Sequence, residues 1–164
     1  MVRSKAQSGA ALVDAGWRTV YRLAYWLLRT WWFVRRPSSY GAMVAVWCEG
    51  HLLVLRQSYR AKLGFPGGSV DAGEPIALAA CRELYEELGI HVMPDALSHV
   101  RDVVLSWEHR RDHVSLFELR LEHPPTLSLD NREIIAADFV PPNSALALPI
   151  SPIVRAYLDE IGIR

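Results

Sequence analysis

Residues 10–34 place hydrophobic and polar side chains with the period of an α-helix. Arg18, Arg22, Arg29 and Arg36 are spaced by four, seven and seven residues, so that at about 100° per residue they form one narrow stripe. The opposite side of the same helix carries apolar residues: Trp17, Val20, Leu23, Ala24, Leu27, Leu28, Trp31 and Val34. Because Pro37 cannot continue a helix, the pattern predicts one amphipathic helix that ends before it.

This helix does not have the pattern of a membrane span. Its longest uncharged stretches, 23–28 and 30–34, fall short of the roughly 20 apolar residues that a span needs. They are also shorter than a secretory signal core of about 7 residues. Three interpretations stay open. The Trp/Leu face packs onto the domain or a second subunit, or the helix lies in an anionic membrane surface, or the segment is an Arg-rich transit peptide.

From residue 40 onward the pattern is that of strands joined by turns. Runs at 40–47 and 51–56 flank Glu49-Gly50, which is a hairpin signal. We expect a loop over 57–73, a helix from Pro75 to Gly89, strands over 98–105, 113–121 and 133–140, and a closing helix over 151–161. At 164 residues the chain suits one compact α/β domain over 37–164, preceded by a basic, Trp-rich helical segment over 1–36.

The candidate chemistry lies in the segment GSVDAGEPIALAACRELYEELGI, residues 68–90. Glu83, Glu86 and Glu87 are three and four residues apart, which places three carboxylates on one helical face. Like charges at this spacing destabilise a helix unless something neutralises them. Hard divalent cations such as Mg²⁺ prefer oxygen ligands, and the preceding glycine-rich loop at 65–68 brings backbone oxygens close. The helical pattern alone leaves two alternatives, a metal site and a solvated acidic face.

Charge is unevenly distributed along a chain whose net charge is zero. Residues 1–36 hold seven Lys/Arg against one acidic residue, whereas 37–164 are acidic by the same margin. No general basic surface argues for duplex nucleic acid. Cys48 and Cys81 have the pattern of small buried apolar residues, and two cysteines form no disulfide framework. We expect a cytoplasmic protein, with peripheral membrane contact or a homodimer through the basic helix as options.

These ordered residues match the Nudix box, so the chain resembles the Nudix hydrolase family of MutT-like pyrophosphohydrolases over about 40–157. The resemblance implies a Nudix fold, a mixed sheet sandwiched between helices, here with an extra N-terminal amphipathic helix. It also implies hydrolysis of a nucleoside diphosphate linked to another moiety, with Mg²⁺ or Mn²⁺ as cofactor. A nucleoside diphosphate sugar or similar conjugate is favoured as substrate, followed by a nucleoside triphosphate.

The resemblance further implies roles for single residues. Glu86 and Glu87 are the first metal ligands, Glu83 is a third ligand or the base, and the backbone oxygen of Gly67 is a further ligand. Glu74 and Arg82 are expected to orient these carboxylates. Glu133 is the first candidate for the general base, and Glu108 and Glu118 are its alternatives.

Four arginines are candidates for binding substrate phosphates, because a guanidinium pairs with phosphate in a fork. Arg56 and Arg60 precede the Nudix box, and Arg110 and Arg111 belong to the polar run 109–113. The alternative interpretation of this run is a solvated hairpin tip without a role in binding. The rival to an enzyme is a binding or regulatory module that keeps the Nudix fold without turnover, tethered to a membrane by its helix. RNA end processing is disfavoured, because an acidic body offers no basic channel for the strand.

Overall fold

The computed structural model describes residues 8–35, 37–107, 109–129 and 131–163. Its elements, in chain order, are α1 (Ser8–Arg35), β1 (Ser38–Cys48), β2 (His51–Gln57), β3 (Gly67–Ser69), α2 (Ile76–Leu88), η1 (Pro94–Ala96), β4 (Ser98–Trp107), β5 (Arg110–Leu121), β6 (Ile134–Val140), α3 (Pro142–Ala145) and α4 (Pro152–Glu160). The predicted α/β order is confirmed. The expected loop over 57–73 is wrong in one part, because β3 lies inside it and pairs with β1.

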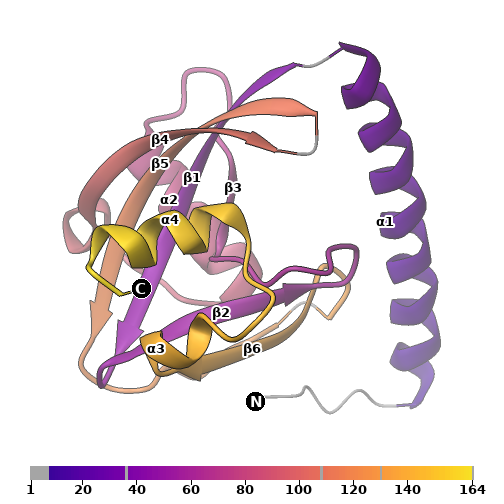
Figure 1. The fold of residues 1–164 in the computed structure, drawn as a ribbon. Helices are drawn as coiled ribbons and strands as arrows, with labels where there is room; N and C mark the ends of the chain where they lie inside the picture. The colour runs from indigo at the N-terminus through magenta and orange to yellow at the C-terminus, as the bar shows by residue number, and fades with distance from the viewer. Residues whose placement is uncertain (1–7, 36, 108, 130, 164) are drawn as a thin grey trace.

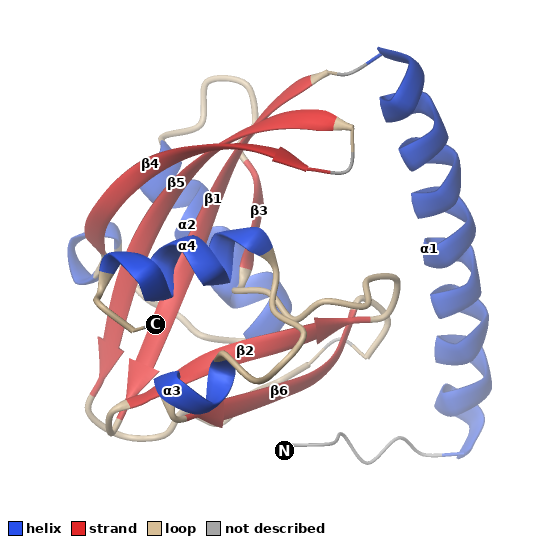
Figure 2. Ribbon diagram, viewed as in Figure 1, coloured by secondary structure: helices blue, strands red, loops and turns tan. Residues whose placement is uncertain are grey.

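The strands form one mixed sheet in the order β4-β5-β1-β2-β6, with β3 also paired to β1 (Figures 1 and 2). The predicted hairpin joins β1 to β2, and Glu49 and Gly50 both have positive φ, as a tight two-residue turn requires. β1 and β5 pair in parallel along their length, from Ser38 opposite Arg111 to Cys48 opposite Leu121. The two strands are far apart in the sequence, so this pairing unites distant residues.

The sheet opens beside β1. β1 and β2 pair at only two positions next to their turn, Trp47 with Leu52 and Cys48 with His51. Farther along, β3 pairs with the other half of β1, from Gly41 to Met43. The ribbons of β1 and β2 diverge in Figure 1. This divergence leaves room for polar side chains at one end of an otherwise apolar sheet.

Helices cover both faces of the sheet, so its central strands are buried on both sides. In β1, Ala42, Val44 and Val46 pack with α2, while Ala45 and Trp47 pack with α4 on the other face. Strands buried on both faces read as continuous apolar runs, which explains the unbroken hydrophobic stretches at 42–48 and 52–55. The fully buried Tyr157 joins the layers, because its hydroxyl accepts from Trp47 Nε1 at 2.5 Å and donates to Glu118 at 2.7 Å. Of the two free cysteines, Cys48 is buried as expected and Cys81 is half-buried.

The helix α1 stands beside the sheet as the long indigo helix of Figure 1. It contacts the domain with its Arg/Tyr side, since Arg18 Nε donates to the Asn131 carbonyl at 2.9 Å and Arg22 Nε donates to the Ser58 carbonyl at 3.1 Å. Tyr25 packs against Tyr59 with ring centroids 5.0 Å apart. Of the options predicted for the Trp/Leu face, packing onto the domain is therefore wrong for most of its residues, which are exposed. The docking surface offers carbonyl oxygens and tyrosine rings, which guanidinium groups and aromatic rings match better than leucines do.

Most apolar side chains of α1 do not pack on the domain. Leu27 and Val34 are 74% and 73% exposed, and Val13, Val20, Leu23, Leu28 and Trp31 are exposed as well. We call these seven residues the outer face of α1. A helix of 28 residues with this exposure departs from the usual rule that the apolar stripe faces the core. Within the described residues, no helix is both long and apolar enough to cross a membrane.

Candidate active site

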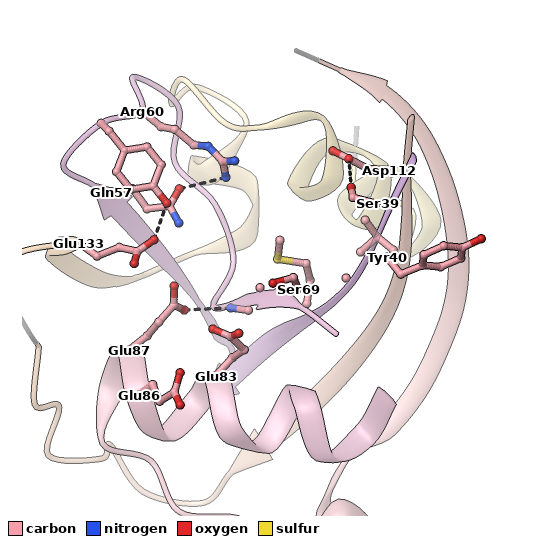
Figure 3. A pocket seen from close by; sticks show the side chains of 16 residues that line it. Ser39, Tyr40, Gln57, Arg60, Ser69, Glu83, Glu86, Glu87, Asp112 and Glu133 are labelled. Carbon is pink, nitrogen blue, oxygen red and sulfur yellow. Dashed lines mark hydrogen bonds between the residues drawn. The ribbon is translucent and has the colours of Figure 1, made fainter. Parts of the chain in front are cut away.

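A cavity of about 390 Å³ opens where β1, β2 and β3 diverge (Figure 3). Four glutamates line it: Glu83, Glu86 and Glu87 from α2, and Glu133 from the segment before β6. The opposite wall comes from the start of β1 and from β5, and Tyr59 and Arg60 close the side next to α1. The sequence thus concentrates acidic groups around a space large enough for a small polar ligand.

The helix α2 presents these carboxylates because its other sides are anchored. Ala79, Ala80, Leu84 and Leu88 are fully buried against the sheet. Gly89 ends the helix in the left-handed conformation, with φ 71°, and cap N–H bonds reach the carbonyls of the last turn. Because the apolar side of α2 is fixed in the core, the opposite side presents Glu83, Glu86 and Glu87 to the cavity.

The glycine loop before α2 packs directly on two of these carboxylates. The Gly67 N–H donates to Glu87 Oε2 at 2.9 Å, inside a buried pocket. Gly67 has a φ of 136°, and a Cβ there would lie 2.1 Å from the Ala42 carbonyl oxygen. A Cβ on Gly68 would lie 2.5 Å from Glu83 Oε1. Both glycines are therefore required, because any side chain would displace the backbone or the carboxylate it packs against.

Arg82 holds the acidic cluster together. Its Nε and Nη2 bind the two oxygens of Glu74 in a fork at 3.0 Å each, and Nη1 donates to Glu83 Oε1 at 2.7 Å. Nη1 also approaches Glu86 Oε2 at 3.4 Å, and Nη2 donates to the Ser69 carbonyl at 3.0 Å. The guanidinium hydrogen bond lowers the pKa of Glu74, and the bonds to Glu74 and Glu83 raise the pKa of Arg82. One cation therefore neutralises part of the repulsion among the carboxylates.

Glu83 and Glu133 sit close enough to affect each other. Burial raises the pKa of Glu83 above its ordinary value, although Arg82 acts in the opposite direction, and the charges of Glu86 and Glu133 raise it further. Glu133 accepts a hydrogen bond from the Tyr59 hydroxyl. Burial also raises the pKa of Tyr59, so its hydroxyl stays protonated as a donor. The cavity thus holds carboxylates in two environments, one paired to a cation and one to a phenol.

The NUDIX domain family matches residues 37–161. The chain belongs to the NUDIX family. The family resemblance and the Nudix fold expected from the sequence are thereby confirmed.

One curated protein and two solved structures illustrate what this chain is similar to. A U8 snoRNA-decapping enzyme from Homalodisca vitripennis is 30% identical over 88 residues, 53% of this chain and 47% of that protein, so the chain spans about half the length of this curated relative. The structure of a MutT NUDIX hydrolase from Burkholderia pseudomallei has a TM-score of 0.66 at 22% identity, covering 76% of this chain and 98% of that one. A bifunctional NMN adenylyltransferase/ADP ribose pyrophosphatase from Francisella tularensis, complexed with AMP and a Mn ion, has a TM-score of 0.63 at 19% identity. That match covers 86% of this chain and 48% of the other.

This Nudix cavity contains residues that the sequence did not single out. Asp112 is buried in β5 and accepts a hydrogen bond from the Ser39 hydroxyl, and both line the wall opposite α2. Gln57 and Tyr59 line the cavity on the α1 side. The only signal for Asp112 in the sequence is a weak one, an acidic residue within a strand of alternating apolar positions. Its closeness to Ser39 depends on the parallel pairing of β1 with β5, which no local pattern predicts.

Several predicted residues do not line the cavity. Arg56 is half-buried on β2 and Arg111 is exposed on β5, and neither is a wall residue. Glu118 binds Tyr157 and Arg120 instead, which gives it a structural role in joining the layers. Of the four predicted phosphate-binding arginines, Arg60 does line the cavity, while the side chain of Arg110 lies outside the described part of the structure. Glu108, the alternative base, also lies outside it.

The donor set suits a hard divalent cation, because four carboxylates face one polar cavity. Among the described residues, however, no three acidic, histidine or cysteine side chains converge on a ready-made metal position. The reason is visible in the contacts: Glu83 and Glu86 turn toward Arg82, and Glu87 accepts from Gly67. Glu86 is 56% exposed and has room to rotate. The residues fit a metal chemically, because carboxylate oxygens are the ligands that a hard divalent cation prefers.

Proposed function

We propose that this protein is a metal-dependent Nudix pyrophosphohydrolase that splits a nucleoside diphosphate linked to another moiety. The observation that carries the proposal is the cavity itself, in which the glutamates of the family motif and Glu133 face the same space beneath the glycine loop. A protein released from catalysis has no need for clustered carboxylates that repel one another. The Mn ion in the Francisella tularensis relative supports a divalent metal, with Mg²⁺ or Mn²⁺ as the candidates.

We assign Glu86 and Glu87 as metal ligands and Glu83 as a third ligand or the base, with the Gly67 backbone oxygen as a further candidate. Arg82 and Glu74 orient these carboxylates, since Arg82 touches Glu83 and Glu86 directly and is itself held by Glu74. When bound, the metal would neutralise phosphate charge and lower the pKa of a bound water.

Glu133 is our candidate for the base that accepts a proton from the attacking water. The Tyr59 hydroxyl fixes its orientation, and it faces the cavity near Glu83 and Glu87 (Figure 3). Water attacks one phosphorus of the diphosphate, and the bond from that phosphorus to the bridging oxygen breaks. The products are two phosphorylated molecules and the proton taken by the base. Arg60, at the cavity wall, is placed to stabilise the negative charge of the phosphates.

We propose a nucleoside diphosphate sugar or a similar conjugate as the substrate. The cavity is polar, and the solved structure named as an ADP ribose pyrophosphatase supports this class. Nucleoside triphosphates come next. The decapping relative adds the capped 5′ end of an RNA, although the acidic charge of 37–164 opposes an extended RNA strand.

The deciding experiment is a hydrolysis screen with and without Mg²⁺ or Mn²⁺ over nucleoside diphosphate sugars, nucleoside triphosphates, dinucleoside polyphosphates and a capped RNA, with products identified. We expect metal-dependent release of two phosphorylated products from at least one class, and its loss in Glu86→Gln. Glu122→Gln, an exposed glutamate away from the cavity, is the matched control. Binding of a nucleotide without turnover in any metal would favour the rival function, a non-catalytic Nudix module.

We also propose that the outer face of α1 rests on an anionic membrane surface. Its support is the exposure of Trp31 and of leucines and valines along the helix, together with the basic charge of residues 1–36. Wild-type protein should sediment with vesicles that contain anionic lipid, and less so as salt rises. The double variant Leu23→Ser/Leu27→Ser should lose vesicle binding. If wild type instead elutes as a dimer and ignores vesicles, the outer face is an interface between two copies.

A further inference from the structure

A second cavity, also of about 390 Å³, lies between α1 and the loop that follows β2. α1 contributes Arg22, Tyr25, Trp26 and Arg29, and the loop contributes residues 58–61, which include Arg60. The charged side chains that line this second cavity, among the described residues, are arginines. The first cavity has the opposite character, since glutamates dominate its charged lining. Two neighbouring spaces of opposite charge therefore lie on the same side of the molecule.

Tyr59 and Arg60 line both cavities and form the wall between them. The Arg60 guanidinium lies 5.7 Å from the Tyr25 ring centroid and 5.6 Å from that of Tyr59, so it spans from the loop to α1. Its Nη1 donates to Gln57 Oε1 at 3.1 Å, on the side of the first cavity. The two cavities therefore adjoin each other at Tyr59 and Arg60.

The arginines of the second cavity have N–H donors beyond those used within the protein. Arg22 donates from Nε to the Ser58 carbonyl, and a guanidinium carries five N–H donors in all. The hydroxyl oxygen of Ser58 is buried without a hydrogen-bond partner, in a residue only 7% exposed. Within the described residues, no hydrogen bond or ion pair involves Arg29. Arg22 and Arg29 therefore keep N–H donors that an anionic ligand in this cavity can use.

The position of α1 that creates this cavity is fixed at both ends. Arg18 binds the Asn131 carbonyl and Arg132 approaches Asp14 at 3.5 Å near one end, while Phe33 packs edge-on against His109 at 5.0 Å near the other. The family match begins at residue 37, after α1 has ended. The helix that lines the second cavity therefore lies outside the residues that the NUDIX family model matches.

We propose that the second cavity binds the phosphate-bearing end of the substrate that lies remote from the bond that is broken. The proposal rests on the function proposed above and adds a substrate class. These substrates carry, besides the diphosphate that is hydrolysed, a further phosphate group on the remote moiety. Arg22, Arg29 and Arg60 pair with the remote phosphate. The rings of Tyr25 and Trp26 flank that group. The first cavity, through its glutamates and their metal, takes the diphosphate that is hydrolysed.

The first test uses binding alone, with inorganic tripolyphosphate as the probe and a chelator present so that the glutamate cavity has no metal. Wild type should bind the probe, measured by calorimetry. Arg29→Gln and Arg22→Gln/Arg29→Gln should each bind at least about tenfold more weakly, because each loses a charge-assisted hydrogen bond to phosphate. Arg155→Gln, an exposed arginine on α4, is the matched control and should bind as wild type does.

Arg29 is the decisive position, since its removal breaks no hydrogen bond or ion pair of α1 with the rest of the described structure. An unchanged melting temperature will show that α1 stays docked in Arg29→Gln. No metal-free binding by wild type, or equal binding by wild type and Arg29→Gln, overturns the proposal. This outcome is independent of whether the protein hydrolyses anything.

The second test uses two substrates with the same diphosphate, one with and one without a phosphate on the remote moiety. Arg29→Gln should raise KM at least about tenfold for the phosphorylated substrate and leave kcat unchanged. Neither constant should change for the other substrate. An equal change in KM for both substrates contradicts the remote phosphate site, whereas absence of turnover in wild type contradicts the proposed function and leaves the binding test to decide.

Discussion

α1 and α2 are both amphipathic helices, yet they use their two sides in opposite ways. α2 buries its apolar side in the core and turns its carboxylates toward the cavity, where Arg82 and the glycine loop hold them. α1 instead docks through arginines and tyrosines and leaves its apolar side exposed. An amphipathic pattern therefore predicts that a helix has two unlike sides, and the surface it meets decides which side faces inward.

The largest expected effect separates the apolar sides of the two helices. Leu84→Ala in α2 should lower the free energy of unfolding by about 2–5 kcal/mol, because Leu84 is fully buried and leaves a cavity. Leu27→Ala in α1 should change it by no more than about 0.5 kcal/mol, because that side chain is already in solvent. Urea unfolding of the two variants measures both. A comparable loss in Leu27→Ala would show that the outer face is covered in solution.

The carboxylates of α2 should dominate activity. Glu86→Gln and Glu87→Gln should each reduce turnover at least about 100-fold, roughly 2.7 kcal/mol of transition-state stabilisation. The fold should remain intact, since the amide that replaces the Glu87 carboxylate keeps an oxygen for the Gly67 N–H. Initial rates at saturating Mg²⁺ are the measurement, with circular dichroism as the control for folding. Near-normal rates in both variants would refute the assignment of these residues as metal ligands.

Divalent metal should stabilise the protein through α2 and leave α1 unaffected. A ligand at 100 times its dissociation constant adds about 2.7 kcal/mol if it binds only the folded state. We expect the melting temperature to rise with Mg²⁺ or Mn²⁺ in wild type and in Arg29→Gln, and to stay flat in Glu86→Gln. A flat wild-type curve at millimolar metal would mean that the metal enters only together with substrate phosphates.

The two-nitrogen contact of Arg82 with Glu74 should affect turnover more than the positive charge of Arg82 does. Arg82→Lys keeps the positive charge but cannot bind Glu74 with two nitrogens while also reaching Glu83 and Ser69. Turnover should fall at least about tenfold, in the range seen when groups that orient metal ligands are removed. Arg101→Lys, an exposed ion pair with Glu160, is the control and should keep full activity. Wild-type rates in Arg82→Lys would reduce Arg82 to a simple counter-charge.

The smallest effect concerns pH and Glu83. Burial raises the folded-state pKa of this carboxyl, so its contribution to stability is present below the ordinary carboxyl pKa of about 4 and is lost as pH rises through the folded value. In the metal-free protein, Glu83→Gln should therefore raise the melting temperature at pH 7 and not at pH 3. Thermal melts in a chelating buffer measure the difference. A variant less stable than wild type at pH 7 would indicate that the pairing with Arg82 outweighs burial.

The sequence predicted those features that depend on local pattern. The hairpin at Glu49-Gly50, the helix that ends at Gly89 and the gathering of Glu83, Glu86 and Glu87 all follow from spacings within a few residues. The strand β3 was missed because three residues rich in glycine carry no periodicity. Asp112, Tyr59 and the inward side of α1 were missed because each depends on a distant partner. Ser39 reaches Asp112 only through the β1–β5 pairing, and Arg18 meets a carbonyl that no side-chain pattern reveals.

The docking of α1 also has a consequence for the order of events during synthesis. Arg18 and the Asn131 carbonyl it binds are separated by 113 residues, so α1 leaves the ribosome long before its partner exists. At translation rates of about 5–20 residues per second, the delay is on the order of 5–20 s. For that time both sides of α1 are open to chaperones and to lipid surfaces. A nascent chain whose first helix meets a membrane in this interval would finish folding there, with its arginines still available to the domain that emerges behind them.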